Sequence, residues 1–117
     1  MIDVLISGRL RGAPTLRTAS NGSPYARFML AASDKKGESL LCGCITFVES
    51  VIQTVKALDD GDSISATGEA ALSHWNDSAG TARHGLDVIV YGVLTAYHVG
   101  RKRRATEASQ IDPDGAP

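Results

Sequence analysis

Aromatic residues are scarce in this 117-residue chain, in which three Tyr, two Phe and one Trp make up 5% of the sequence. Long hydrophobic runs are missing as well, because no segment approaches the ~20 consecutive apolar residues of a membrane-spanning helix. The first ten residues alternate apolar with polar side chains instead of forming the apolar centre of a signal peptide. These absences predict a soluble, cytoplasmic protein without a membrane partner, and the length suits a single domain.

Cysteine is limited to Cys42 and Cys44. On a strand, this spacing places both thiols on one face with extended backbone between them, so a strain-free disulfide is not expected. A zinc site needs about four ligands, and His74, His84 and His98 lack a finger-like spacing to the two cysteines. We therefore predict no metal and no cofactor, and we interpret the cysteines as small buried apolar side chains.

Catalytic motifs are missing too. The chain contains no G-x-x-x-x-G-K phosphate loop, no nucleophile elbow and no spaced set of His and carboxylate residues. We therefore predict that the protein is not an enzyme and has no catalytic residues.

Charge is unevenly distributed, although the net charge is only -1. Residues 1–36 carry six Lys or Arg against two acids, whereas residues 37–97 carry two against eight. From residue 98 onward the count is four against three, and all four basic residues lie between Arg101 and Arg104. This asymmetry is compatible with an electropositive stripe or with a merely solvated surface.

The order of elements follows from the hydrophobic periodicity. Period-two alternation predicts strands at 2–10 and 63–72, and the turn and hairpin signals between segments delimit further strands at 25–33, 39–47 and 86–93. Gly8 is expected to bend the first strand, as a small barrel requires. Asn21 and Gly22 predict a hairpin turn, residues 34–38 are expected to form another hairpin loop, and residues 73–85 are expected to form a polar hairpin.

A single helix interrupts the strands. Val48, Val51, Ile52, Val55 and Leu58 are spaced three or four apart, which predicts a helix of about three turns. Three strands, a helix and two strands is the element order of an OB-fold, so we predict an all-β, five-stranded Greek-key barrel with the helix between strands three and four. The barrel is expected to span residues 1–100.

Residues 101–117 are expected to form a short flexible tail that is first basic and then acidic. The basic cluster from Arg101 to Arg104 is either a mobile electrostatic arm for a nucleic-acid backbone or a solubilising tail.

Several segments occur in an order and at a spacing that resemble the bacterial single-stranded DNA-binding protein family. They are residues 6–10 (ISGRL), 14–17 (PTLR), 21–22 (NG), 26–31 (ARFMLA), 45–47 (ITF) and the hairpin with Gly68, Trp75, Asn76, Asp77, Gly80 and Arg83. The resemblance runs from about Ile2 to Tyr97. Primosomal replication protein B is a relative with the same fold.

The resemblance implies which residues would contact DNA. Phe47 and Trp75 stand where the family places two of the aromatic rings that stack on bases, and packing in the barrel core is the alternative role for each. The candidate phosphate contacts lie on the first strand or on hairpins that flank the expected groove, and each could instead be a solvated surface charge. They are Arg9, Arg11, Lys35, Lys36 and Arg83.

This chain also departs from the family pattern. Leu41 replaces a tryptophan, and Lys35 and Lys36 stand in place of another aromatic. Gly43 and Glu49 occupy positions where the family tends to have arginine and lysine. We therefore expect binding that depends more on phosphate contacts than on stacking and that is weaker or more sensitive to salt.

The C-terminal end lacks the acidic tip closing on Pro-Phe through which the family recruits other proteins, because this sequence ends Gly115, Ala116 and Pro117. Recruitment of replication or recombination proteins through that tip is therefore not carried over.

The resemblance implies sequence-independent binding of single-stranded DNA in replication, recombination or repair. It also implies a homo-oligomer, a tetramer as in the family or a dimer as in the primosomal relative. The alternative function is a primosomal B-like assembly subunit that acts mainly through protein contacts.

Overall fold

The computed structural model describes residues 1–95 as one sheet with a single short helix. The elements are β1 (Ile2–Leu10), β2 (Thr15–Thr18), β3 (Pro24–Ser33), β4 (Ser39–Thr46), α1 (Glu49–Val55), β5 (Ser63–Asn76) and β6 (Ala82–Thr95). Among these residues, no helix combines the length and the hydropathy needed to cross a lipid bilayer. The expected tail at 101–117 and the barrel boundary at residue 100 lie outside the described residues.

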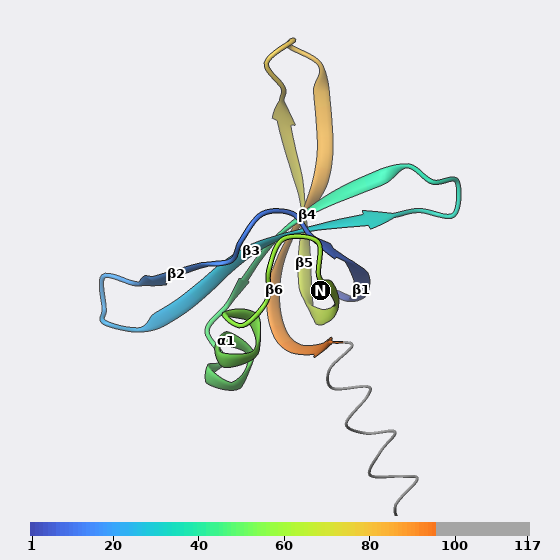
Figure 1. Ribbon diagram of the computed structural model, residues 1–117. Coiled ribbons are helices and arrows are strands. Elements are labelled where there is room, and N and C mark those ends of the chain that lie inside the picture. The colour runs from blue at the N-terminus through green and yellow to red at the C-terminus, as the bar shows by residue number, and fades with distance from the viewer. Residues whose placement is uncertain (96–117) are drawn as a thin grey trace, which may run out of the picture.

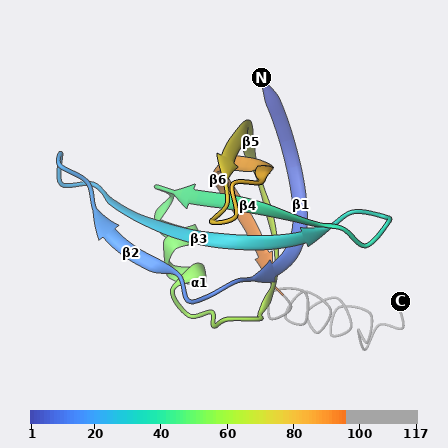
Figure 2. The same cartoon turned by 90° about the horizontal axis from the view of Figure 1, so that it is seen from above.

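Five strands close into a ring. The sheet order is β1-β5-β6-β4-β3-β2, and an additional pairing of β1 with β3 closes the circle (Figure 2). Only the pairing between β4 and β6 is parallel, whereas the others are antiparallel. This is the predicted five-stranded barrel of the OB-fold.

A sixth strand, β2, was not predicted as a separate strand. It pairs only with β3, outside the ring, and all four of its side chains are exposed. Without a buried face it shows no alternation of apolar and polar residues, which is the signal that sequence-based assignment needs. Its hairpin with β3 turns at Asn21 and Gly22 as predicted, and Gly22 has a φ of 87°.

Gly8 allows β1 to change partners. Residues 2–9 of β1 pair with β5, and its last two residues, Arg9 and Leu10, pair with β3. A Cβ at Gly8 would lie 2.5 Å from the Ala31 carbonyl oxygen. Only glycine permits so close an approach between two backbones, which confirms the bend predicted there.

The core consists of the side chains on the inner face of each of the five barrel strands. Alternate residues of β3 and β4 are buried, including Phe28, Leu30, Cys42 and Cys44, and α1 adds Val51, Ile52 and Val55 from below. The Thr46 hydroxyl is fully buried; it donates to the Val90 carbonyl oxygen at 2.9 Å and accepts from the Val48 N–H. These two hydrogen bonds offset the cost of removing the hydroxyl from water.

Helix α1 is shorter than predicted. It has seven residues instead of about three turns. Beyond Val55, the N–H groups of Ala57 and Leu58 bond to carbonyls three residues back, so the predicted third turn is a tighter, non-α turn. The spacing of Leu58 from Val55 fits an α-helical turn and the tighter turn equally well, so periodicity overestimated the length of the helix.

The strands of the β5–β6 hairpin are longer than predicted. Within the polar hairpin predicted at 73–85, residues 73–76 and 82–85 continue the two strands, and residues 77–81 form the turn. Asp77 closes that turn by accepting hydrogen bonds from the N–H groups of Ala79 and Thr81. The extension, called here the distal arm (residues 73–85), projects away from α1 (Figure 1). Because most of its residues are exposed, its side chains carry no strand-like alternation of buried and exposed positions.

Candidate nucleic-acid interface

The outer face of the sheet is defined by the residues that alternate with the core. On β3, Ala26, Phe28 and Leu30 point inward and are buried. Arg27 and Met29 point outward between them and are exposed. Since successive side chains of a strand lie on opposite faces, Tyr25, Arg27, Met29 and Ala31 follow one line along the outside of the barrel, over ~20 Å.

The first hollow on this face, called here the Trp75 hollow, lies where β3 and β4 meet the distal arm. It has a volume of about 540 Å³ and is lined by Arg11, Leu41, Trp75, Asp77, Arg83 and their neighbours. Three of the residues predicted from the sequence, Arg11, Trp75 and Arg83, therefore come together here. An indole and two guanidinium groups at one hollow combine a stacking surface with two phosphate-binding charges.

Trp75 is neither a core residue nor a free side chain. Its side chain remains 39% exposed. Its ring lies against the backbone at Gly85, where a Cβ would come within 3.1 Å of ring atoms Cη2 and Cζ3 and would overlap the Leu41 carbonyl oxygen. The glycine therefore supplies a flat support that holds one side of the indole while the rest of the ring stays accessible.

Arg83 is held in place by Asp77. The Arg83 Nε–H donates to Asp77 Oδ2 at 3.0 Å, and Arg83 pairs across the strands with Trp75. Backbone hydrogen bonding from Thr81, followed by the contact with Arg83, holds the pKa of the Asp77 carboxyl below its usual value. The carboxylate thus stays charged and uses one edge of the guanidinium, which leaves its other N–H groups for an incoming phosphate.

A second hollow, called here the Tyr25 hollow, lies further along β3. It has a volume of about 370 Å³ and is lined by Thr15, Arg17, Tyr25, Arg27, Met29 and their neighbours. Tyr25 also contacts Phe47, with the ring centroids 5.6 Å apart and tilted by 42°. Phe47 is 52% exposed, so its alternative role in the core is wrong.

Sequence reasoning missed Arg17, Tyr25 and Arg27. Alternation within residues 25–33 could have placed Tyr25 and Arg27 on the outer face together. The neighbourhood of Arg17 could not be predicted, because it depends on the β2–β3 register, which pairs Arg17 with Tyr25.

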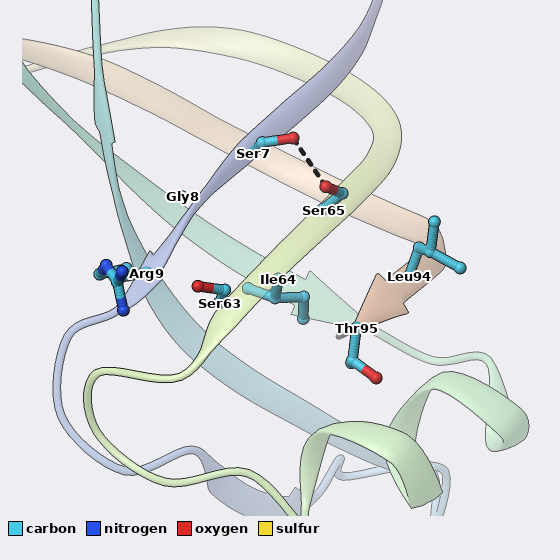
Figure 3. Close-up of a pocket in the computed structure, with 8 residues that line it drawn as sticks. All are labelled: Ser7, Gly8, Arg9, Ser63, Ile64, Ser65, Leu94 and Thr95. Atoms are coloured by element: carbon cyan, nitrogen blue, oxygen red, sulfur yellow. Dashed lines mark hydrogen bonds between the residues drawn. The ribbon is translucent and has the colours of Figure 1, made fainter. Parts of the chain in front are cut away.

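The other predicted phosphate contacts lie apart from the Trp75 hollow. Arg9 lines a different hollow of about 390 Å³ between β1 and β5 (Figure 3), and its guanidinium donates to the Gly61 carbonyl oxygen at 3.0 Å. Lys35 and Lys36 occupy the exposed turn between β3 and β4. The structure therefore does not bring these three residues together with Arg11, Trp75 and Arg83.

A third hollow on the outer face is unsuited to a phosphate backbone. Glu69 and Asp87 line it opposite Arg27. Burial and then the charge of Glu69 raise the pKa of neighbouring Tyr91, so its phenol stays neutral. A strand of DNA would be repelled here, which favours a path along β3 between the Trp75 and Tyr25 hollows.

Cys42 and Cys44 are both buried and free. Burial raises the pKa of both thiols, and for Cys44 it does so, with a further effect of Cys42, to about 12. Both therefore remain neutral at physiological pH, which agrees with the predicted role as small core side chains.

Comparison with known proteins gives one consistent result. The sequence model of the single-strand binding protein family matches residues 1–96. A single-stranded DNA-binding protein of Clostridium perfringens is 31% identical over 93 residues, which cover 77% of this chain and 62% of that protein. The chain thus spans less than two thirds of the length of this relative.

Solved structures resemble the fold as well. The small single-stranded DNA-binding protein from Streptomyces coelicolor superposes with a TM-score of 0.65 at 20% identity, over 80% of this chain and 93% of its own. A mitochondrial single-stranded DNA binding protein from S. cerevisiae gives a TM-score of 0.62 at 17% identity, over 81% and 94%. At these identities the likeness establishes the OB-fold architecture.

Proposed function

Because this chain belongs to the single-strand binding protein family, we propose that it binds single-stranded DNA without sequence preference along the outer face of β3, from the Trp75 hollow to the Tyr25 hollow. The observation that carries the proposal is the meeting of Trp75, Arg11 and Arg83 at one hollow. Every base has a π-face, so stacking tolerates any sequence, while the arginines bind the phosphates that every nucleotide carries.

Both ends of the path along β3 carry aromatic rings and arginine side chains. Trp75 with Arg11 and Arg83 forms one end, and Phe47 with Tyr25, Arg17 and Arg27 forms the other. Arg9, Lys35 and Lys36 remain in the proposal as contacts outside this path. Leu41, in place of an aromatic, lines the Trp75 hollow with an aliphatic side chain, which supports a smaller contribution from stacking.

Proteins of this family bind DNA and are not enzymes, which confirms the prediction that this chain is not an enzyme. The comparisons do not favour the alternative of a primosomal B-like assembly subunit, because the matched relatives are single-stranded DNA-binding proteins. Roles in replication, recombination or repair, a cytoplasmic location and partners among replication or recombination proteins remain predictions.

The salt dependence of binding tests the proposed phosphate contacts. For a single strand, each neutralised phosphate contributes ~0.7 to the slope of log affinity against log salt concentration. We expect the double variant Arg11→Ala, Arg83→Ala to bind labelled oligo(dT) more weakly, with a slope shallower by ~1.4 when both contacts are lost.

Lys56→Ala is the matched control for this experiment. It removes an exposed positive charge at the end of α1, at the opposite end of the barrel from the distal arm (Figure 1), and its slope should equal that of the parent. A double variant with the slope of the parent would remove Arg11 and Arg83 from the DNA path.

Single-strand binding proteins oligomerise, and we propose a homotetramer for this chain. Along residues 2–8, β1 pairs with β5 on one side, and no described strand covers its other edge. The outer face nearby carries exposed apolar side chains, among them Leu5 at 76% exposure, Tyr91 and Leu94. A free edge beside an apolar surface is suited to burial against identical copies.

Light scattering at micromolar concentration should therefore give a mass four times that of one chain. Leu5→Lys should lower that mass, since it places a charge on the apolar surface. A monomeric parent would contradict the proposal, and a dimer would correct its stoichiometry.

The basic cluster from Arg101 to Arg104 lies outside the described residues. Its role as an electrostatic arm stays a prediction.

A further inference from the structure

Two histidines face each other across the distal arm. His74 on β5 pairs directly with His84 on β6, and both side chains are exposed. Their Nδ1 atoms lie 2.7 Å apart, with the rings nearly perpendicular at 88° and the centroids 4.9 Å apart. His84 also lines the Trp75 hollow, whereas His74 does not. The sequence offered no spacing that would have identified the pair.

The two Nδ1 atoms lie within hydrogen-bond distance of each other on exposed side chains. At 2.7 Å they share one proton in a hydrogen bond. If both rings carry their proton on Nε2, both Nδ1 lone pairs become available on the same side of the hairpin. Neutral imidazole nitrogen is the commonest metal ligand among side chains, and two strands joined by a short turn hold this pair in register.

The distance between the two Nδ1 atoms can be compared with the spacing of neighbouring ligands in different coordination geometries. Two ligands in cis positions at 90°, each ~2.0 Å from a metal, lie ~2.8 Å apart, whereas two tetrahedral ligands lie ~3.3 Å apart. The observed 2.7 Å is thus close to the cis spacing of a square-planar or octahedral ion. Within residues 1–95, no group of three or more His, Cys, Asp or Glu side chains is suited to a closed tetrahedral site.

We propose that His74 and His84 form a bidentate site for a divalent transition metal that prefers cis nitrogen ligands, Ni²⁺ or Cu²⁺, with water in the remaining positions. This inference goes beyond the proposed DNA binding and replaces the expectation of no metal. The metal would link β5 to β6 at a position adjacent to Trp75 and Arg83 and would stabilise the pairing of the arm that carries them.

The test is a calorimetric titration of the full, untagged chain with NiCl2. Ni²⁺ is the probe because, unlike Cu²⁺, it does not oxidise cysteine thiols. We expect one Ni²⁺ per chain, with affinity reduced by about tenfold or more in His74→Gln and in His84→Gln, since each variant leaves a single nitrogen ligand. His98→Gln is the matched control and should bind Ni²⁺ as the parent does.

Thermal unfolding separates metal binding from folding. Ni²⁺ should raise the Tm of the parent and of His98→Gln, and it should leave the Tm of the other two variants unchanged. Those two variants should unfold near the Tm of the metal-free parent, because both side chains are exposed. Equal Ni²⁺ affinity in His74→Gln and the parent would overturn the proposal, as would a parent that binds no Ni²⁺; neither result would bear on DNA binding.

Discussion

Replacing Trp75 with alanine is expected to weaken the binding of oligo(dT) by ~1–3 kcal/mol, or about 5- to 150-fold, if one base stacks on this ring. The reason is that the indole offers the largest π-face on the outer surface and keeps 39% of its side chain exposed beside Arg11 and Arg83. Anisotropy of a labelled oligonucleotide measures this loss without needing the tryptophan itself.

Trp75→Phe is the matched control, because it keeps an aromatic face of smaller area at the same place. It should bind with an affinity between those of the parent and of the alanine variant. The Tm of Trp75→Ala should fall little, since the ring lies on the solvated distal arm. If folded Trp75→Ala instead binds oligo(dT) with the affinity of the parent, stacking at this position is wrong and Phe47 and Tyr25 would supply it.

Gly85→Ala is expected to affect both stability and binding. The new Cβ would overlap the Leu41 carbonyl oxygen in the parallel pairing of β4 with β6, and it would press on the indole of Trp75. Overpacking of this kind costs ~1–3 kcal/mol, which in a domain of about 100 residues lowers the Tm by ~4–8 °C per kcal/mol. Because the new Cβ would displace the Trp75 indole, we also expect a lower affinity for oligo(dT).

Gly43→Ala is the matched control, because it also replaces a glycine in the pairing of β4 with β6. Its Cβ would meet an Asp87 side-chain oxygen at 3.2 Å, a flexible group that can move away. We expect it to keep the Tm and the oligo(dT) affinity of the parent within a small margin. A Gly85→Ala variant as stable and as tightly binding as Gly43→Ala would show that the backbone at position 85 does not support Trp75.

The barrel was predictable because its strands each have one buried face. Alternation along residues 2–10 and 63–72, and a glycine that interrupts the first of these segments, are visible in a single sequence. By contrast, β2 was not predicted as a separate strand, and the predicted strands 63–72 and 86–93 stopped short of the distal arm. The side chains of β2 and of the distal arm are mostly exposed, so hydrogen bonds between backbones define these strands and leave no alternating pattern in the side chains.

The interface was predictable only in part. The resemblance indicated Trp75, Arg11 and Arg83, which the fold brings to one hollow. The meeting of Tyr25 with Phe47 and of His74 with His84 depends on the distance between sheet neighbours and on the register set by the turn at 77–81. Neither is encoded in local periodicity, so a structure was required to see them.

The intrinsic fluorescence of Trp75 tests the central claim most directly, because it is the only tryptophan in the chain. Titrating the intact protein with oligo(dT), with a mixed-sequence strand and with a DNA duplex compares the three ligands at one ring. The proposed function predicts saturable quenching by both single strands at similar concentrations and far weaker quenching by the duplex, whose bases are already stacked and paired. Emission that neither single strand changes, or that the duplex quenches equally well, would contradict single-stranded DNA binding at this face.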